Sequence, residues 1–295
     1  MNSIYRNKNG AKEAFIQAYD RTLQEWDAPA QSIYIDTSFG KTHVLVSGQE
    51  GAEPLILFHG FGFSSTMWIE NIKPLSEQYR TYAVDFLGDI NKSEAIWQIK
   101  NKEECARWFR EILSGLRIQK AHVAGLSYGG FIALVLAANS SELIHKMVVM
   151  SPAASFQVQS KKFFIKCLLA GIFPTTKRLN GLMNEMTGKG NQVNVILRNQ
   201  FIVGMQNAMP KNKLFPSYMK DDELKAIQCP ILLLIGDQDI QYDPLKAIAR
   251  ANKLVPYIQS KLVADAGHGL AMEQPETINA LMISFFGGTE VRPIN

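Results

Sequence analysis

The chain has 295 residues, of which 46% are apolar and 20% charged, and a formal net charge of +4. This is the composition of an ordinary globular protein, and the charge is too small to indicate a nucleic-acid partner. No apolar run approaches the roughly 20 residues of a membrane-spanning helix. The first residues lack the apolar core of a signal peptide, so we expect a cytoplasmic protein.

The cysteines and histidines do not form a metal-binding pattern. Cys105, Cys167 and Cys229 lie far apart in the sequence, and the five histidines follow no zinc-ligand spacing. We therefore expect reduced, mostly buried thiols and neither a metal site nor a cofactor.

The first predicted elements are a helix and a hairpin. Phe15, Tyr19 and Leu23 recur at helical spacing, which predicts an amphipathic helix over residues 11–26 within an N-terminal extension, residues 1–30. Residues 32–48 alternate like two strands joined around residues 38–40. We expect this hairpin to form an antiparallel edge of a larger sheet.

Strands and helices alternate along the rest of the chain. Apolar runs predict strands over residues 54–60, 80–88, 120–127, 146–152, 229–239 and 260–268. Helical periodicity covers residues 66–78, 101–116, 129–140, 243–255 and 275–286, and His145 is placed in a helical segment. The pattern predicts an α/β fold, a mostly parallel central sheet flanked by helices, built from residues 31–153 and 226–295.

Residues 154–225 interrupt this alternation. They are helical in period, rich in Met and Phe, and show no strand pattern. Because ligands of open α/β sheets bind beyond the carboxyl ends of the strands, an insertion that leaves from such an end would cover the site. We therefore predict a helical lid inserted in the core.

The motif "GLSYGG" provides a candidate nucleophile. It lies between a predicted strand and a predicted helix, which is the context that a nucleophile elbow requires. Gly125 and Gly129 would let neighbouring backbone pass close to a strained turn, and the hydroxyl of Ser127 would stand clear of the sheet edge. Ser127 is therefore the predicted nucleophile.

A serine hydroxyl needs a base, and the base needs a carboxylate that holds its tautomer. His268 lies between two glycines in a loop after the last predicted strand, where core packing does not explain an imidazole. Asp239, at the end of "ILLLIGDQD", is the favoured carboxylate. Asp237 is its chief rival, and Asp243 is a third candidate.

The segment "FHGFGFSS" fits the remaining requirement of acyl transfer, which is an oxyanion hole. Fixed N–H groups that point at the developing negative charge stabilise a tetrahedral intermediate by about 3 kcal/mol each. Tyr128, directly after the predicted nucleophile, and Phe61, between two glycines, are the predicted backbone donors.

The blocks "HGFG", "GLSYGG", "GDQD" and "GHGLAMEQPE" resemble those of the α/β-hydrolase superfamily in type, order and spacing, over about residues 32–286. The resemblance implies that fold and the chain order Ser, acid, His, which falls on Ser127, Asp239 and His268. Relatives commonly carry Asp-x-x-Gly-x-Gly-x-Ser after the next strand. Here "DFLGDINKS" lacks the second glycine and its serine is displaced, so we expect this loop to have a different shape.

A serine at the elbow sets the chain apart from similar dehalogenases and epoxide hydrolases, which carry an aspartate there. We favour a serine carboxylesterase that cleaves small to medium apolar esters through an acyl-enzyme intermediate, with a small-molecule ester as its partner. The apolar residues of the lid and of the oxyanion loop favour such substrates. The predicted pocket residues are Phe61, Trp68, Phe164, Phe201, Met205 and Leu270.

Other functions share the same residues. Some proteins that resemble this fold keep a complete triad but serve as small-molecule receptors in signalling, and the fold alone does not separate the two. Among enzymes, a carbon–carbon bond hydrolase and a lactonase are the nearest alternatives. The sequence leaves the physiological substrate, the position of the lid and the oligomeric state open.

Overall fold

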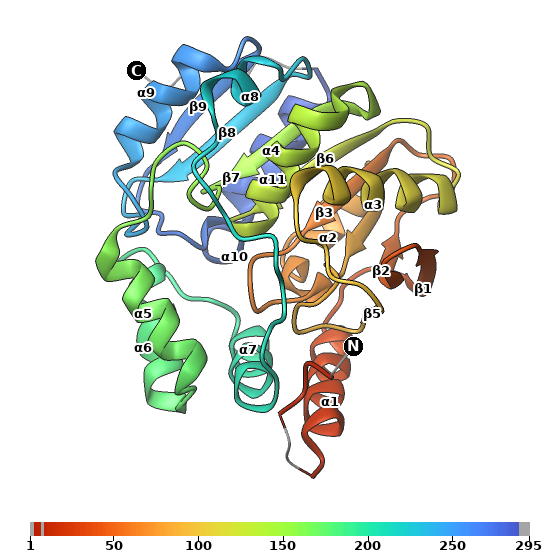
Figure 1. Cartoon of the computed structure of the whole chain (residues 1–295), viewed down its shortest axis with the longest axis vertical. Helices are drawn as coiled ribbons and strands as arrows, with labels where there is room; N and C mark the ends of the chain where they lie inside the picture. Colours follow the sequence, from red (N-terminus) through yellow and green to blue (C-terminus); the bar gives the residue numbers. More distant parts are fainter. Residues whose placement is uncertain (1–2, 7–8, 289–295) are drawn as a thin grey trace.

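The computed structural model describes residues 3–6 and 9–288, and Figure 1 shows its elements. Parts of the predicted N-terminal extension (residues 1–2 and 7–8) and the end of the last core segment (residues 289–295) lie outside the described residues. The described part of the chain contains a central sheet with helices on both sides. None of the helices described is long and apolar enough to cross a membrane.

The sheet has nine strands in the described residues, and its order is β1-β2-β4-β3-β6-β7-β8-β9, with β5 paired to β2. The strands are β1 (Ala30–Thr37), β2 (Gly40–Ser47), β3 (Pro54–Phe58), β4 (Arg80–Val84), β5 (Glu94–Ala95), β6 (Ala121–Leu126), β7 (Ile144–Met150), β8 (Ile231–Gly236) and β9 (Ile258–Val263). The pairs from β4 to β9 are parallel, whereas β2 pairs antiparallel with β1 and β4. The predicted α/β fold with its antiparallel edge is confirmed.

Helices cover both faces of the sheet because successive side chains of a strand point to opposite faces. In β3, Leu55 and Leu57 join one apolar cluster, and Ile56 and Phe58 join the other. The cluster with Ile56 includes residues from α3 (Lys102–Gly115), α4 (Tyr128–Ser140) and α9 (Pro244–Leu254). The cluster with Leu55 includes residues from α1 (Ala11–Gln24), α2 (Ile72–Ser76) and α11 (Pro275–Phe286).

Four helices lie between β7 and β8: α5 (Lys161–Ile172), α6 (Thr176–Met186), α7 (Val195–Asn207) and α8 (Asp221–Lys225). The first three begin at Ser160, Thr175 and Asn194, whose side chains accept backbone N–H groups of the first turn. In Figure 1, α5, α6 and α7 gather with α1 at the end of the molecule opposite α8 and α9. α1 packs directly against α7.

Two local predictions were wrong, and one short strand was not predicted. Residues 66–78 form a 3₁₀ turn (Ser65–Trp68) and the separate α2, because the ring of Pro74 would clash with the carbonyl of residue 70 in a continuous helix. His145 lies in β7 rather than in a helix, since the exposed His145 only interrupts an apolar strand. The short β5 has no apolar pattern, and it pairs with Gly40 and Lys41 of β2.

We expect the close contact between α4 and β3 to make Gly129 indispensable for stability. A Cβ at Gly129 would lie 2.2 Å from the carbonyl oxygen of Phe58, so Gly129→Ala should cost at least 1–3 kcal/mol and lower the melting temperature by about 5 °C or more. Gly181→Ala in α6 is the control, because no atom lies within 4 Å of its Cβ position and alanine favours helix. Thermal melts followed by circular dichroism test this, and a wild-type melting temperature for Gly129→Ala would contradict it.

Candidate active site

Ser127 occupies the sharp turn between β6 and α4. Its backbone dihedrals are φ 55° and ψ −111°, a conformation that costs a non-glycine residue roughly 1–3 kcal/mol. The backbone on the two sides of the turn lies so close together that a Cβ at Gly125 would be 2.3 Å from the carbonyl oxygen of Gly129, so only glycine fits at this position. The Ser127 N–H donates to the Met150 carbonyl at 2.9 Å, which fixes the turn to β7.

His268 lies in the loop between β9 and α10 (Leu270–Glu273), and its side chain reaches Ser127. Its Nε2 is 2.8 Å from Ser127 Oγ, which places the imidazole within hydrogen-bond distance of the serine hydroxyl. The imidazole is enclosed: His268 is 5% exposed, and the ring of Phe163 from α5 lies 5.7 Å away between centroids. Water therefore has little access to the ring.

Asp239 completes this chain of contacts at the end of β8. Its Oδ2 lies 3.0 Å from His268 Nδ1, and its Oδ1 accepts the Gln241 N–H at 2.7 Å. The rival carboxylates lie elsewhere. Asp237 is exposed and accepts the Ala266 N–H, whereas Asp243 caps the first turn of α9. Of the three candidates, the structure brings only Asp239 to His268.

The loop that carries His268 is tied to the inserted helices, which the sequence reading missed. The His268 N–H donates to the carbonyl of Met186, the last residue of α6, at 2.7 Å. The carboxylate of Glu273 accepts the N–H groups of Gly267 and Gly188. Asn191 Nδ2 donates to the Asp265 carbonyl at 2.7 Å. We call residues 186–191 the anchor segment.

The two predicted oxyanion donors, Phe61 and Tyr128, follow the neighbouring parallel strands β3 and β6. Within the residues that the structure describes, neither the Phe61 nor the Tyr128 backbone N–H makes a hydrogen bond. Their rings meet edge to face, with centroids 5.9 Å apart. The Phe61 ring is 45% exposed, and the Tyr128 ring is buried with its hydroxyl donating to the Leu214 carbonyl. Both amides are therefore free to bind a developing oxyanion.

The loop that departs from the motif it resembles is held by hydrogen bonds of its own buried acids. Asp85 is fully buried and accepts the Ser65 N–H at 2.6 Å, while its Oδ2 lies 2.7 Å from His43 Nδ1. The displaced Ser93 donates its hydroxyl to the Asp85 carbonyl. The next acid, Asp89, is also fully buried. The sequence analysis assigned no role to Asp89 or Glu273, because no local sequence pattern predicts which distant N–H group a carboxylate will bind.

The predicted pocket residues fall into three groups. Phe201 and Met205 of α7 lie beside the oxyanion turn, since a Cβ at Gly62 would lie 3.1 Å and 3.2 Å from their side chains. Trp68 and Leu270 are fully buried in the apolar core. Phe164 is 56% exposed on α5, and Phe61 is exposed at the turn itself.

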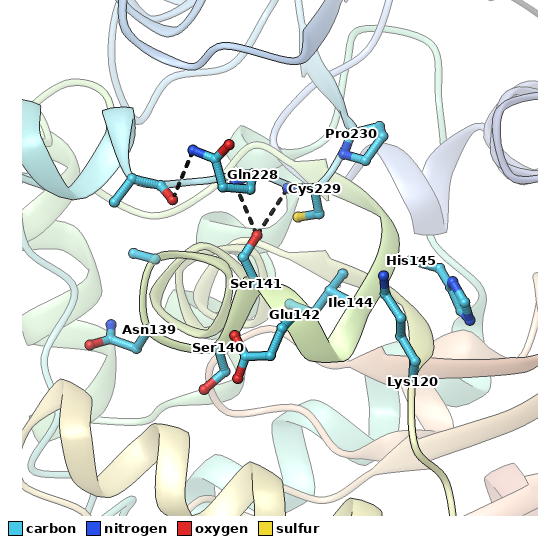
Figure 2. A pocket seen from close by; sticks show the side chains of 12 residues that line it. Lys120, Asn139, Ser140, Ser141, Glu142, Ile144, His145, Gln228, Cys229 and Pro230 are labelled. Carbon is cyan, nitrogen blue, oxygen red and sulfur yellow. Dashed lines mark hydrogen bonds between the residues drawn. The ribbon is translucent and has the colours of Figure 1, made fainter.

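A surface depression lies elsewhere, at the amino ends of the strands (Figure 2). It is lined by residues at or before the starts of β6, β7 and β8, among them Lys120, Ile144 and Pro230. Ser141 Oγ there accepts the N–H groups of Gln228 and Cys229, each at 2.9 Å. Ser127, Asp239 and His268 all follow the carboxyl ends of strands, so the depression is separate from their site.

Comparisons with known proteins agree with this geometry. A family model described as the alpha/beta hydrolase fold matches residues 53–275. Carboxylesterase YbfK of Bacillus subtilis is 36% identical over 281 residues, which cover 93% of this chain and 94% of that protein. The uncharacterized carboxylesterase nap of the same organism is 37% identical, and the match covers 92% of each chain.

Solved structures give the same result. The crystal structure of naproxen esterase (carboxylesterase NP) from Bacillus subtilis superposes with a TM-score of 0.90 at 35% identity, covering 95% of this chain and all of that one. That of carboxylesterase CesB (YbfK) from Bacillus subtilis gives a TM-score of 0.88, also at 35% identity. With a family model over most of its length and relatives that span it nearly end to end, the chain belongs to the α/β-hydrolase family.

Proposed function

We propose that the protein is a serine carboxylesterase whose catalytic residues are Ser127, His268 and Asp239. The observation that carries the proposal is the continuous contact from the Ser127 hydroxyl through the imidazole to a buried carboxylate. The names of the two Bacillus subtilis relatives, both carboxylesterases, support ester hydrolysis over the other reactions of the fold.

Acylation uses the three side chains in sequence. His268 Nε2 takes the hydroxyl proton as Ser127 Oγ attacks the ester carbonyl carbon, and the carbonyl oxygen becomes an oxyanion. Asp239 accepts the His268 Nδ1–H and stabilises the imidazolium. The imidazolium then gives its proton to the departing alcohol, and the acyl group remains on Ser127. In the second half, His268 deprotonates a water molecule, and the water oxygen attacks the acyl carbon. The imidazolium then returns the proton to Ser127 Oγ as the carboxylic acid leaves.

The Phe61 and Tyr128 amides are the proposed oxyanion hole. Both are unpaired in the described structure, and Tyr128 directly follows the nucleophile at the start of α4. Removal of one such donor typically costs roughly 10²–10³-fold in kcat. No cofactor enters these steps.

We further propose that the inserted helices form a lid over an apolar acyl pocket. Phe163 lies beside the imidazole, and Phe201 and Met205 lie beside the oxyanion turn. α5 also exposes an apolar stripe with helical spacing, which its C-cap residue Phe173 extends: Phe164, Ile165, Leu168, Leu169 and Ile172. These surfaces suit apolar acyl groups, because a ligand pocket gains affinity mainly from apolar burial.

Ser127→Ala should fold like the wild type and lose ester hydrolysis by about 10⁴-fold or more, since the attacking oxygen is gone. Hydrolysis of p-nitrophenyl butyrate and labelling by a fluorophosphonate measure this loss. Ser151→Ala is the matched control: Ser151 follows the neighbouring strand β7, and its buried hydroxyl makes no hydrogen bond in the described residues. Activity that survives in Ser127→Ala would show that another residue is the nucleophile.

The identity of the acid is tested by two equivalent substitutions. Asp239→Asn should lower kcat by about 10⁴-fold, because the amide no longer holds the required imidazole tautomer. Asp237→Asn should change kcat by about twofold at most, as expected for an exposed side chain that does not contact His268. The reverse result would transfer the role to Asp237.

The apolar preference is tested by p-nitrophenyl esters of increasing acyl length. We expect kcat/KM to rise from acetate by up to about fourfold per methylene, the value of a buried CH₂, until the pocket is filled. A naproxen ester belongs in the panel because of the solved relative. Faster cleavage of a carboxylate-bearing acyl group, such as a hemisuccinate, than of butyrate would refute an apolar pocket.

A further inference from the structure

We propose that Asp89 is a positioning residue for the oxyanion hole, holding the turn that presents the Phe61 amide. The inference rests on the proposed ester hydrolysis at Ser127. Asp89 is fully buried, and Oδ1 and Oδ2 lie 3.1 Å and 3.3 Å from the Gly62 nitrogen. Its Oδ1 also accepts the N–H of Ile90 at 2.8 Å. The carboxylate thus connects the loop after β4 to the turn after β3.

The turn itself is a tight one, in which each peptide has a defined partner. The Phe63 N–H donates to the Gly60 carbonyl at 3.1 Å, and Gly62 has φ 77°, the geometry of a type II turn. The Gly60 carbonyl belongs to the same peptide as the Phe61 N–H, so this bond sets the direction in which that N–H points. Asp89 fixes the following peptide, between Phe61 and Gly62. The Phe61 N–H is the unpaired group of the first of these two peptides, and both peptides are held in place.

His59 also holds the turn, through the Gly60 carbonyl. Its Nε2 accepts the Phe86 N–H at 3.0 Å, so the ring is neutral and its Nδ1–H donates to the Gly60 carbonyl at 2.9 Å. Besides His59, the ionisable groups near Asp89 are the carboxylate of Asp85 and the hydroxyl of Tyr128. Burial raises the pKa of Asp89 to about 6, although His59 and the N–H groups of Ile90 and Gly62 act to lower it. A buried acid without a cationic partner is poorly explained as a device for stability.

Replacement of Asp89 should separate catalysis from folding. Asp89→Ala leaves the Gly62 and Ile90 amides without their acceptor, and we expect kcat to fall by about 100-fold through misplacement of the Phe61 N–H. KM should stay within about threefold, because an oxyanion contact is made only in the transition state. Asp89→Asn keeps one carbonyl oxygen in place and should restore kcat to within about threefold of the wild type.

A trifluoromethyl ketone gives a direct readout, because it binds as a tetrahedral oxyanion adduct of the serine. Its affinity should weaken in Asp89→Ala by the same factor as kcat, while affinity for the carboxylic acid product stays constant. Asp85→Ala is the control: it removes an equally buried carboxylate of the same loop that accepts the Ser65 rather than the Gly62 N–H, and it should lower the melting temperature without this selective loss.

Stability against pH adds an independent signature. The folded pKa of about 6 lies above the ordinary value of 3.8, so the contribution of Asp89 to stability is fully present below pH 4 and is lost as the pH rises through 6. Asp89→Asn should therefore melt no lower than the wild type at pH 8, with the difference shrinking toward pH 4. A carboxylate kept for stability would show the opposite order at pH 8.

The outcomes distinguish this inference from the proposed function. A wild type that is inactive toward esters and unlabelled at Ser127 would overturn both. An active wild type together with an Asp89→Ala variant of unchanged kcat, or one whose losses of substrate, product and ketone binding are parallel, would overturn the role of Asp89 alone. The selective loss in Asp89→Ala, with recovery in Asp89→Asn, would establish it.

Discussion

The contact between the first turn of α4 and the strands β3 and β6 is the constraint on which the site depends. Backbone atoms at Gly125 and Gly129 approach so closely that any side chain would collide with a carbonyl. The chain can then pass from strand to helix within one residue, and Ser127 takes up a strained conformation to do so. The same turn leaves the Tyr128 amide unpaired. The strained serine and the unpaired amide thus have the same structural cause.

The parallel sheet brings the other residues to this turn. Phe61, Ser127, Asp239 and His268 each follow the carboxyl end of a strand, and those strands are β3, β6, β8 and β9. Ser127 and His268 are 141 positions apart in the sequence, yet their side chains meet at 2.8 Å. The chemistry is therefore carried by loops, while the buried strands set the distances between them.

Much of this arrangement could be predicted because buried parallel strands appear in a sequence as short, nearly continuous apolar runs. Every residue of β8, "ILLLIG", is buried, and such a run stands out without any structure. The break at Pro74 and the short β5 were missed because apolar periodicity does not register a ring clash or a two-residue pairing. The nucleophile turn was predictable since its glycines are a local necessity.

The structural roles of the buried acids Asp89 and Glu273 could not be predicted from the sequence, for a different reason. Asp89 and Glu273 act through amides 27 and 85 positions away, at Gly62 and Gly188, and each could as well have been a solvated surface residue. Burial decides between these roles, and burial of a single polar residue is a property of the folded chain. Ser93, which stands one position later than in the motif that the loop resembles, donates its hydroxyl to the Asp85 carbonyl at 2.7 Å, and this bond too is visible only in the folded chain.

The anchor segment attaches the inserted helices to the loop that carries His268. The backbone bond from His268 to Met186 and the bridge from Glu273 to Gly188 join the end of α6 to the loop that carries the imidazole. The carboxyl end of α6 and the imidazole are therefore held by the same short stretch of backbone, so a change that loosened residues 186–191 would also displace His268.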